Sequence, residues 1–123
     1  MNKKRLFKQL NSLCKELQNR YDINNGGCCF VAATIAEQFE IYNIPFTIIK
    51  YDSEGLHYAI RVNDRIINRD NYFCREIVDE FYISSETLYL IYKNNNWNPY
   101  YNTKYNETVS NKIKSLFHEN NRT

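Results

Sequence analysis

The segment GGCCFVAATIAEQF, residues 26–39, constrains the fold more strongly than any other part of the chain. Val31, Ile35 and Phe39 occupy every fourth position, a spacing that is typical of one face of a helix. Alanines and cysteines fill many of the positions between them, so the helix is apolar on most of its surface. Such a helix is stable only where neighbouring elements cover it almost completely. We therefore expect it at the centre of the fold.

Three strands are predicted after this helix. Residues 45–52 are rich in β-branched and aromatic side chains, which favour a strand. Residues 56–62 and 65–68 flank the pair Asn63-Asp64, which suits a two-residue turn, so they are predicted to form a β-hairpin. In that hairpin Val62 faces Arg65.

Further helices are predicted on both sides of the strands. They cover residues 3–20, residues 74–81, a segment from a serine cap at Ser84 or Ser85 to about residue 93, and a final segment marked by Val109, Ile113, Leu116 and Phe117. The pattern predicts an α+β fold over residues 1–123. In this fold the N-terminal helices pack on a small antiparallel β-sheet, the C-terminus is helical, and the chain forms a single domain.

The charge balance gives no reason to expect nucleic acid or an anionic membrane as a partner. The chain has 16 Lys and Arg against 14 Asp and Glu, a formal net charge of +2. No apolar run approaches the ~20 residues of a membrane span, and no apolar region follows the basic N-terminus as in a signal peptide. We expect a soluble cytoplasmic protein.

Four cysteines, Cys14, Cys28, Cys29 and Cys74, are expected to be reduced in that compartment. Zinc sites use cysteine pairs separated by a few residues, whereas two of these cysteines are adjacent. The two histidines do not complete a ligand set. We expect neither a metal nor another cofactor.

Cys28 has the surroundings of a nucleophile. A helix N-terminus favours the thiolate through its N–H groups and dipole. Gly26 and Gly27 have no side chains, so a substrate carbonyl can approach the backbone, and an N–H at the helix start can donate to a developing oxyanion. Cys29 is the rival, but it lies in line with alanines on a face suited to tight packing. We favour Cys28.

His57, in the first strand of the hairpin, is the candidate base. The predicted register places it opposite Asp70, with Asn68 as its diagonal neighbour on the same face. Either residue can orient the imidazole. Catalysis requires the Cys28 sulfur within about 4–5 Å of a ring nitrogen. Positions on opposite faces of the sheet would argue against an enzyme.

The combination of GGC at the start of an Ala-rich helix, then His, a short hairpin and Asn or Asp, resembles the papain-like cysteine peptidase superfamily, including its small phage and bacterial members. Similar layouts occur in transglutaminase-like proteins and arylamine N-acetyltransferases. The resemblance covers about residues 20–72 and implies a papain-like fold. It implies Asn68 as the third catalytic residue, with Asp70 as the alternative. Papain completes its oxyanion hole with a glutamine some residues before the cysteine. This chain has no glutamine between Asn19 and Cys28, and Asn24 or Asn25 can substitute.

The predicted function is a cysteine-dependent hydrolase or acyl transferase of the peptidase, amidase or deamidase type, acting on a protein or peptide. The alternative is a non-catalytic binding or inhibitor protein on the same fold, possibly encoded by a phage. Rapid alkylation of Cys28 would favour the enzyme.

Overall fold

The computed structural model describes residues 1–23, 27–53, 55–69, 76–95 and 103–122. The elements in chain order are α1 (Lys3–Tyr21), α2 (Cys28–Ile41), β1 (Thr47–Ser53), β2 (Gly55–Val62), β3 (Arg65–Ile67), β4 (Glu76–Phe81), α3 (Ser85–Asn95) and α4 (Thr103–Asn121). The strands pair antiparallel in one sheet of order β3-β2-β1-β4. The α+β class and the helical C-terminus predicted from the sequence are confirmed.

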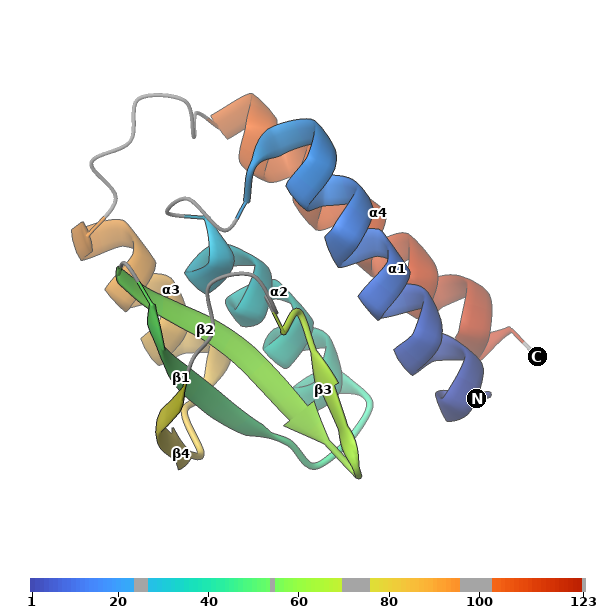
Figure 1. Cartoon of the computed structure of the whole chain (residues 1–123). Helices are drawn as coiled ribbons and strands as arrows, with labels where there is room; N and C mark the ends of the chain where they lie inside the picture. Colours follow the sequence, from blue (N-terminus) through green and yellow to red (C-terminus); the bar gives the residue numbers. More distant parts are fainter. Residues whose placement is uncertain (24–26, 54, 70–75, 96–102, 123) are drawn as a thin grey trace.

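The helix α2 is the centre of the molecule, as its composition predicted. It contacts α3, α4 and β2, and it lies between the sheet and the pair formed by α1 and α4 (Figure 1). One hydrophobic cluster runs from Leu6 to Phe117 and includes most of α2. Phe39 is fully buried in this cluster, and its ring lies 5.5 Å from that of Phe117 and 6.0 Å from that of Phe7. Edge-on ring contacts of this kind add to the stabilisation that burial alone provides.

The helices α1 and α4 run antiparallel, so the two chain ends lie close together (Figure 1). Asn120 is fully buried between the helices. Its Oδ1 accepts from Arg5 Nε at 2.8 Å, and its Nδ2 donates to Gln9 Oε1 at 2.7 Å. The buried amide of α4 is thus satisfied by two side chains of α1, which fixes the register of the two helices.

The hairpin of β2 and β3 has the predicted register. Val62 pairs with Arg65, and Ile60 pairs with Ile67. Asn63 has φ 52°, in the left-handed region that asparagine tolerates better than most residues. The two-residue turn at Asn63-Asp64 is therefore confirmed.

The helix predicted over residues 74–81 is wrong. Residues 70–75 lie outside the described part of the chain, and Glu76–Phe81 forms β4, which pairs with β1 at the edge of the sheet. The pairing register shifts at Lys50/Tyr51, a bulge that interrupts the alternation of a regular strand. Pairing with a distant strand decides the conformation here, and local propensity does not.

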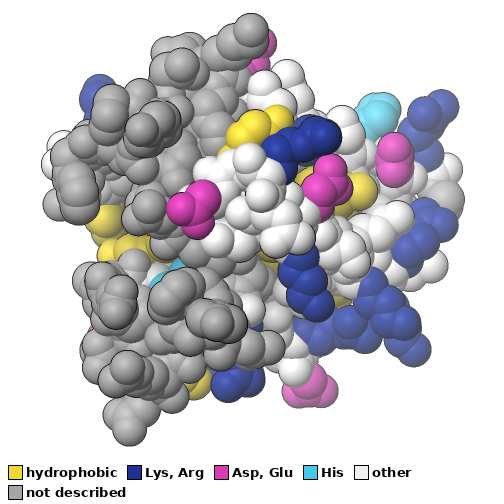
Figure 2. Space-filling model, turned by 45° about the horizontal axis from the view of Figure 1, so that its top comes forward, with side chains coloured by type: hydrophobic (Ala, Val, Ile, Leu, Met, Phe, Trp, Pro, Cys, Tyr) yellow, Lys and Arg dark blue, Asp and Glu magenta, His cyan; other side chains and the backbone are white. Residues whose placement is uncertain are grey.

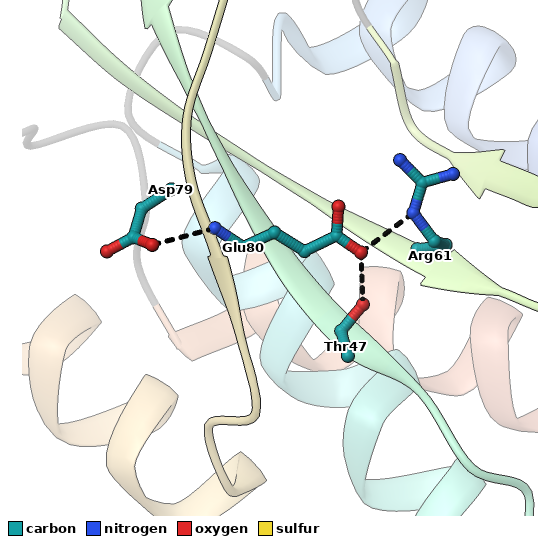
Figure 3. Close-up of polar contacts among 4 residues, drawn as sticks. All are labelled: Thr47, Arg61, Asp79 and Glu80. Carbon is teal, nitrogen blue, oxygen red and sulfur yellow. Dashed lines mark hydrogen bonds and ion pairs between the residues drawn. The ribbon is translucent and has the colours of Figure 1, made fainter.

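Glu80 ties β4 to the other strands on one face of the sheet (Figure 3). Its Oε2 accepts from Arg61 Nε at 2.7 Å and from Thr47 Oγ1 at 2.8 Å, so a single carboxylate bridges β4, β2 and β1. The hydrogen bonds from Arg61 and Thr47 lower the pKa of Glu80. Because Arg61 and Glu80 are partly exposed to solvent, the ion pair contributes little to stability.

Charged side chains of both signs lie on the face of the molecule shown in Figure 2. Within the described parts of the chain, no helix combines the length and the apolar character needed to cross a membrane.

The start of α3 is held by α2. Ser84 caps α3, because its Oγ accepts from the Thr87 N–H at 3.2 Å, as predicted from the sequence. Glu40, near the end of α2, accepts from the Ser85 N–H at 3.0 Å through Oε2 and from the Ser85 hydroxyl through Oε1. Ser85 is buried.

Replacing this carboxylate tests the junction between α2 and α3. In Glu40→Ala the buried N–H and hydroxyl of Ser85 lose their charged acceptor. We therefore expect the free energy of unfolding to fall by about 1.5–3 kcal/mol. The matched variant is Glu37→Ala, one turn earlier on α2. Its free energy of unfolding, measured by urea denaturation, should stay within about 0.5 kcal/mol of the parent's. Equal effects of the two substitutions would contradict the role given to Glu40.

Candidate functional site

The N-terminus of α2 carries the candidate nucleophile. Cys28 is the first residue of the helix, Gly27 is its N-cap, and the first helical bond runs from the Val31 N–H to the Gly27 carbonyl at 3.1 Å. The N–H groups of the first helical turn cannot find acceptors within the helix, so they form the region of positive potential that favours a thiolate. The Cys28 side chain is 4% exposed.

Gly27 differs from the expected oxyanion site in one respect. Its N–H donates to the Ile23 carbonyl at 2.6 Å, so this group is occupied by the turn that leads into α2. Any donor to an oxyanion at the helix start therefore belongs to the residues that follow Gly27. The expected substitutes for the missing glutamine, Asn24 and Asn25, lie outside the described residues.

Cys29, next to Cys28 in the chain, has a structural role in the packing of α2 against α3. Its side chain is 6% exposed, and its Sγ donates to the Leu88 carbonyl of α3 at 3.3 Å. Burial, followed by the neighbouring Cys28, raises the pKa of Cys29 to about 12, although a hydrogen bond from the Tyr92 backbone and the charge of Lys50 act in the opposite direction. Cys29 therefore remains a thiol at neutral pH and packs α2 against α3.

His57 lies in β2 and is buried, with 3% of its surface exposed. Its Nε2 is 2.6 Å from the backbone carbonyl oxygen of Asn68. A carbonyl oxygen can only accept, so Nε2 carries the proton of this contact. In the neutral imidazole the other nitrogen, Nδ1, is then the basic atom. The contact thus selects the tautomer that is protonated on Nε2. In this tautomer Nδ1 can accept a proton.

Asn68 is the partner of His57 through its backbone, whereas a side-chain oxygen was expected from the sequence. The last pair between β2 and β3 is Ile60–Ile67, and Asn68 has φ 65°, in the left-handed region. The chain leaves the strand at this residue, and its carbonyl meets the imidazole. Asp70, the alternative third residue, lies outside the described part of the chain.

The strand alternation places the imidazole and the core on opposite sides of β2. Tyr58 belongs to the main cluster with Cys28, and successive side chains of a strand point to opposite faces. His57 pairs with Tyr51, which belongs to the second, smaller cluster, and the two ring centroids are 6.2 Å apart. This arrangement differs from the convergence on one face that the sequence argument required. Placement of the ring on the face opposite the cluster that contains Cys28 argues against an enzyme, by the criterion stated in the sequence analysis.

Other candidate groups do not add to the site. Among the residues that the structure describes, no group of three or more His, Cys, Asp or Glu side chains could hold a metal ion. His118 is exposed in the last turn of α4. Cys14, Cys28 and Cys29 are reduced thiols, and Cys74 lies outside the described residues.

Comparisons of the chain with protein-family models, with curated proteins and with solved structures found no match. The assignment of a function therefore depends on the chain's own residues.

The cysteines should differ in reactivity while the protein is folded. Burial raises the pKa of Cys14 and of Cys29 to about 12. At pH 8 roughly one such thiol in 10⁴ is ionised, and the thiolate is the form that reacts. We expect iodoacetamide to leave both residues unmodified in the native protein and to label them after denaturation, as mapped by mass spectrometry of peptides. Native labelling of either residue at the rate seen in denaturant would contradict the described burial.

Proposed function

We propose that the chain is a cysteine-dependent hydrolase or acyl transferase of the peptidase, amidase or deamidase type, acting on a protein or peptide. Cys28 is the nucleophile, His57 is the base, and Asn68 orients the imidazole. The observation that carries the proposal is the 2.6 Å contact between His57 Nε2 and the Asn68 carbonyl, because it leaves Nδ1 as the basic nitrogen of a buried ring.

The proposed reaction needs no cofactor. His57 Nδ1 removes the proton of the Cys28 thiol, and the thiolate forms a bond to the substrate carbonyl carbon. N–H groups at the start of α2 stabilise the oxyanion. The carbon–nitrogen bond then breaks, and the imidazolium gives its proton to the leaving amine. Water hydrolyses the resulting thioester, or a second amine accepts the acyl group.

The role of Cys29 supports the choice of Cys28 as nucleophile. Two adjacent cysteines compete for the assignment, and the Cys29 sulfur is engaged with the Leu88 carbonyl of α3. Its pKa of about 12 keeps it protonated at neutral pH. We therefore assign the role of nucleophile to Cys28, the first residue of α2.

Strand alternation sets a geometric condition on the proposal. His57 leaves β2 on the side opposite Tyr58, so the Cys28 sulfur has to reach Nδ1 past the strand edge. The same observation, with the burial of both side chains, favours the second candidate function. In that case the fold carries a non-catalytic binding or inhibitor protein, possibly encoded by a phage.

Alkylation kinetics separate the two candidates. For the enzyme we expect iodoacetamide to modify Cys28 in the native protein, and His57→Gln to slow this modification at least about tenfold, because the base that promotes the thiolate is lost. His118→Gln is the matched control on the other histidine and should have no effect. Cys28→Ser should abolish the native labelling at this position with little change in melting temperature.

Two results would support the binding protein instead. One is a Cys28 that reacts no faster than Cys29 in the native state. The other is a Cys28 that reacts at the same rate in His57→Gln as in the parent protein, since the histidine then has no influence on the thiol.

A further inference from the structure

Asn11 of α1 contacts the outer edge of β3 through two hydrogen bonds from one side chain. Its Nδ2 donates to the Ile66 carbonyl at 3.2 Å, and its Oδ1 accepts from the Asn68 N–H at 3.1 Å. The amide group thus serves one acceptor and one donor of the strand edge, as the peptide group of a neighbouring strand does.

This contact acts where the chain turns away from the sheet. Ile67 is the last residue of β3, and Asn68 adopts φ 65°. A non-glycine residue in the left-handed region needs local contacts to hold it there. The N–H of Asn68 is held by Asn11, and its carbonyl receives the proton of His57 Nε2 at 2.6 Å. One residue is therefore anchored from both sides.

We propose that Asn11 is a positioning residue for His57, acting through the backbone of Asn68. By binding Ile66 and Asn68 together, it sets the direction of the carbonyl that selects the imidazole tautomer. The catalytic consequence rests on the proposed function, whereas the orientation of the ring does not. Asn11 is linked to His57 through the peptide groups of Asn68.

The side chain of Asn11 is suited to this role because it lies on a helix that is anchored elsewhere. Leu10 and Cys14, on either side of it in α1, are buried in the main core, and α1 packs against β3. The amide is therefore presented to the strand edge from a rigid element. A residue held in this way can transmit position to the site without touching a substrate.

The test is the exchange with water of two protons, followed by NMR in the full-length chain. In Asn11→Ala we expect the Asn68 amide proton and the His57 Nε2 proton to exchange at least about tenfold faster than in the parent. Alanine favours helix, so α1 is retained. Asn11→Asp keeps the acceptor for the Asn68 N–H, so its His57 proton should exchange more slowly than in Asn11→Ala. Asn19→Ala, which removes an exposed amide of α1, is the matched control. In this variant both protons should exchange at the parent's rates.

The inference is overturned if His57 Nε2 exchange in folded Asn11→Ala equals that of the parent. It is also overturned if Asn19→Ala accelerates the exchange equally, since the effect is then a general loosening of α1. Asn11→Leu, which keeps the γ-branched shape of the side chain and has a higher helix propensity, replaces Asn11→Ala if that variant does not fold, with the same two expected outcomes. These readouts do not involve Cys28, so they remain valid if the alkylation experiment rejects the proposed enzyme.

Discussion

The burial of α2 is the constraint on which the rest of the structure depends. Its buried residues lie on all sides of the helix, so a sheet on one side is not enough to cover it. The chain meets this demand with the sheet, α3 and the α1–α4 pair, and the main cluster joins them around α2. Cys28 is the first residue of this helix. The position of the candidate nucleophile is therefore set by the packing of the core.

The second candidate group, His57, is positioned by the end of a short strand. A buried imidazole N–H without an acceptor would cost about 1–3 kcal/mol. The carbonyl of Asn68 provides the acceptor because β3 stops at Ile67 and the backbone turns into the left-handed region. One carbonyl thus satisfies the buried donor at the position where the strand ends. It also links α1 to the site, since Asn11 holds the same peptide.

Periodicity and turn chemistry predicted much of the fold. The helix over residues 3–20, the central helix from Cys28 and the register at Asn63-Asp64 follow from side-chain spacing and a turn signal. The segment that forms β4 was predicted as a helix because its partner, β1, lies more than twenty residues earlier and no local pattern records the pairing.

The contact between His57 and Asn68 was predictable as far as the two residues go, and the atoms that make it were not. Sequence spacing placed Asp70 opposite His57 and Asn68 on its diagonal. The oxygen that meets the ring belongs to the backbone of Asn68, which leaves the strand with φ 65°. The occupied N–H of Gly27 and the two bonds of Asn11 likewise depend on backbone directions. Single polar contacts between distant elements produce no periodic pattern of residue types in a sequence.

The central claim is that Asn68 holds His57 as the tautomer protonated on Nε2. The most direct measurement is a long-range ¹H–¹⁵N correlation spectrum of the two histidine rings at a pH where both are neutral, with exposed His118 as the internal reference. The account predicts a single Nε2–H tautomer for His57, with Nδ1 carrying the lone pair. A ring protonated on Nδ1, or the averaged signals of a ring that exchanges between tautomers as in a solvent-exposed histidine, would contradict it.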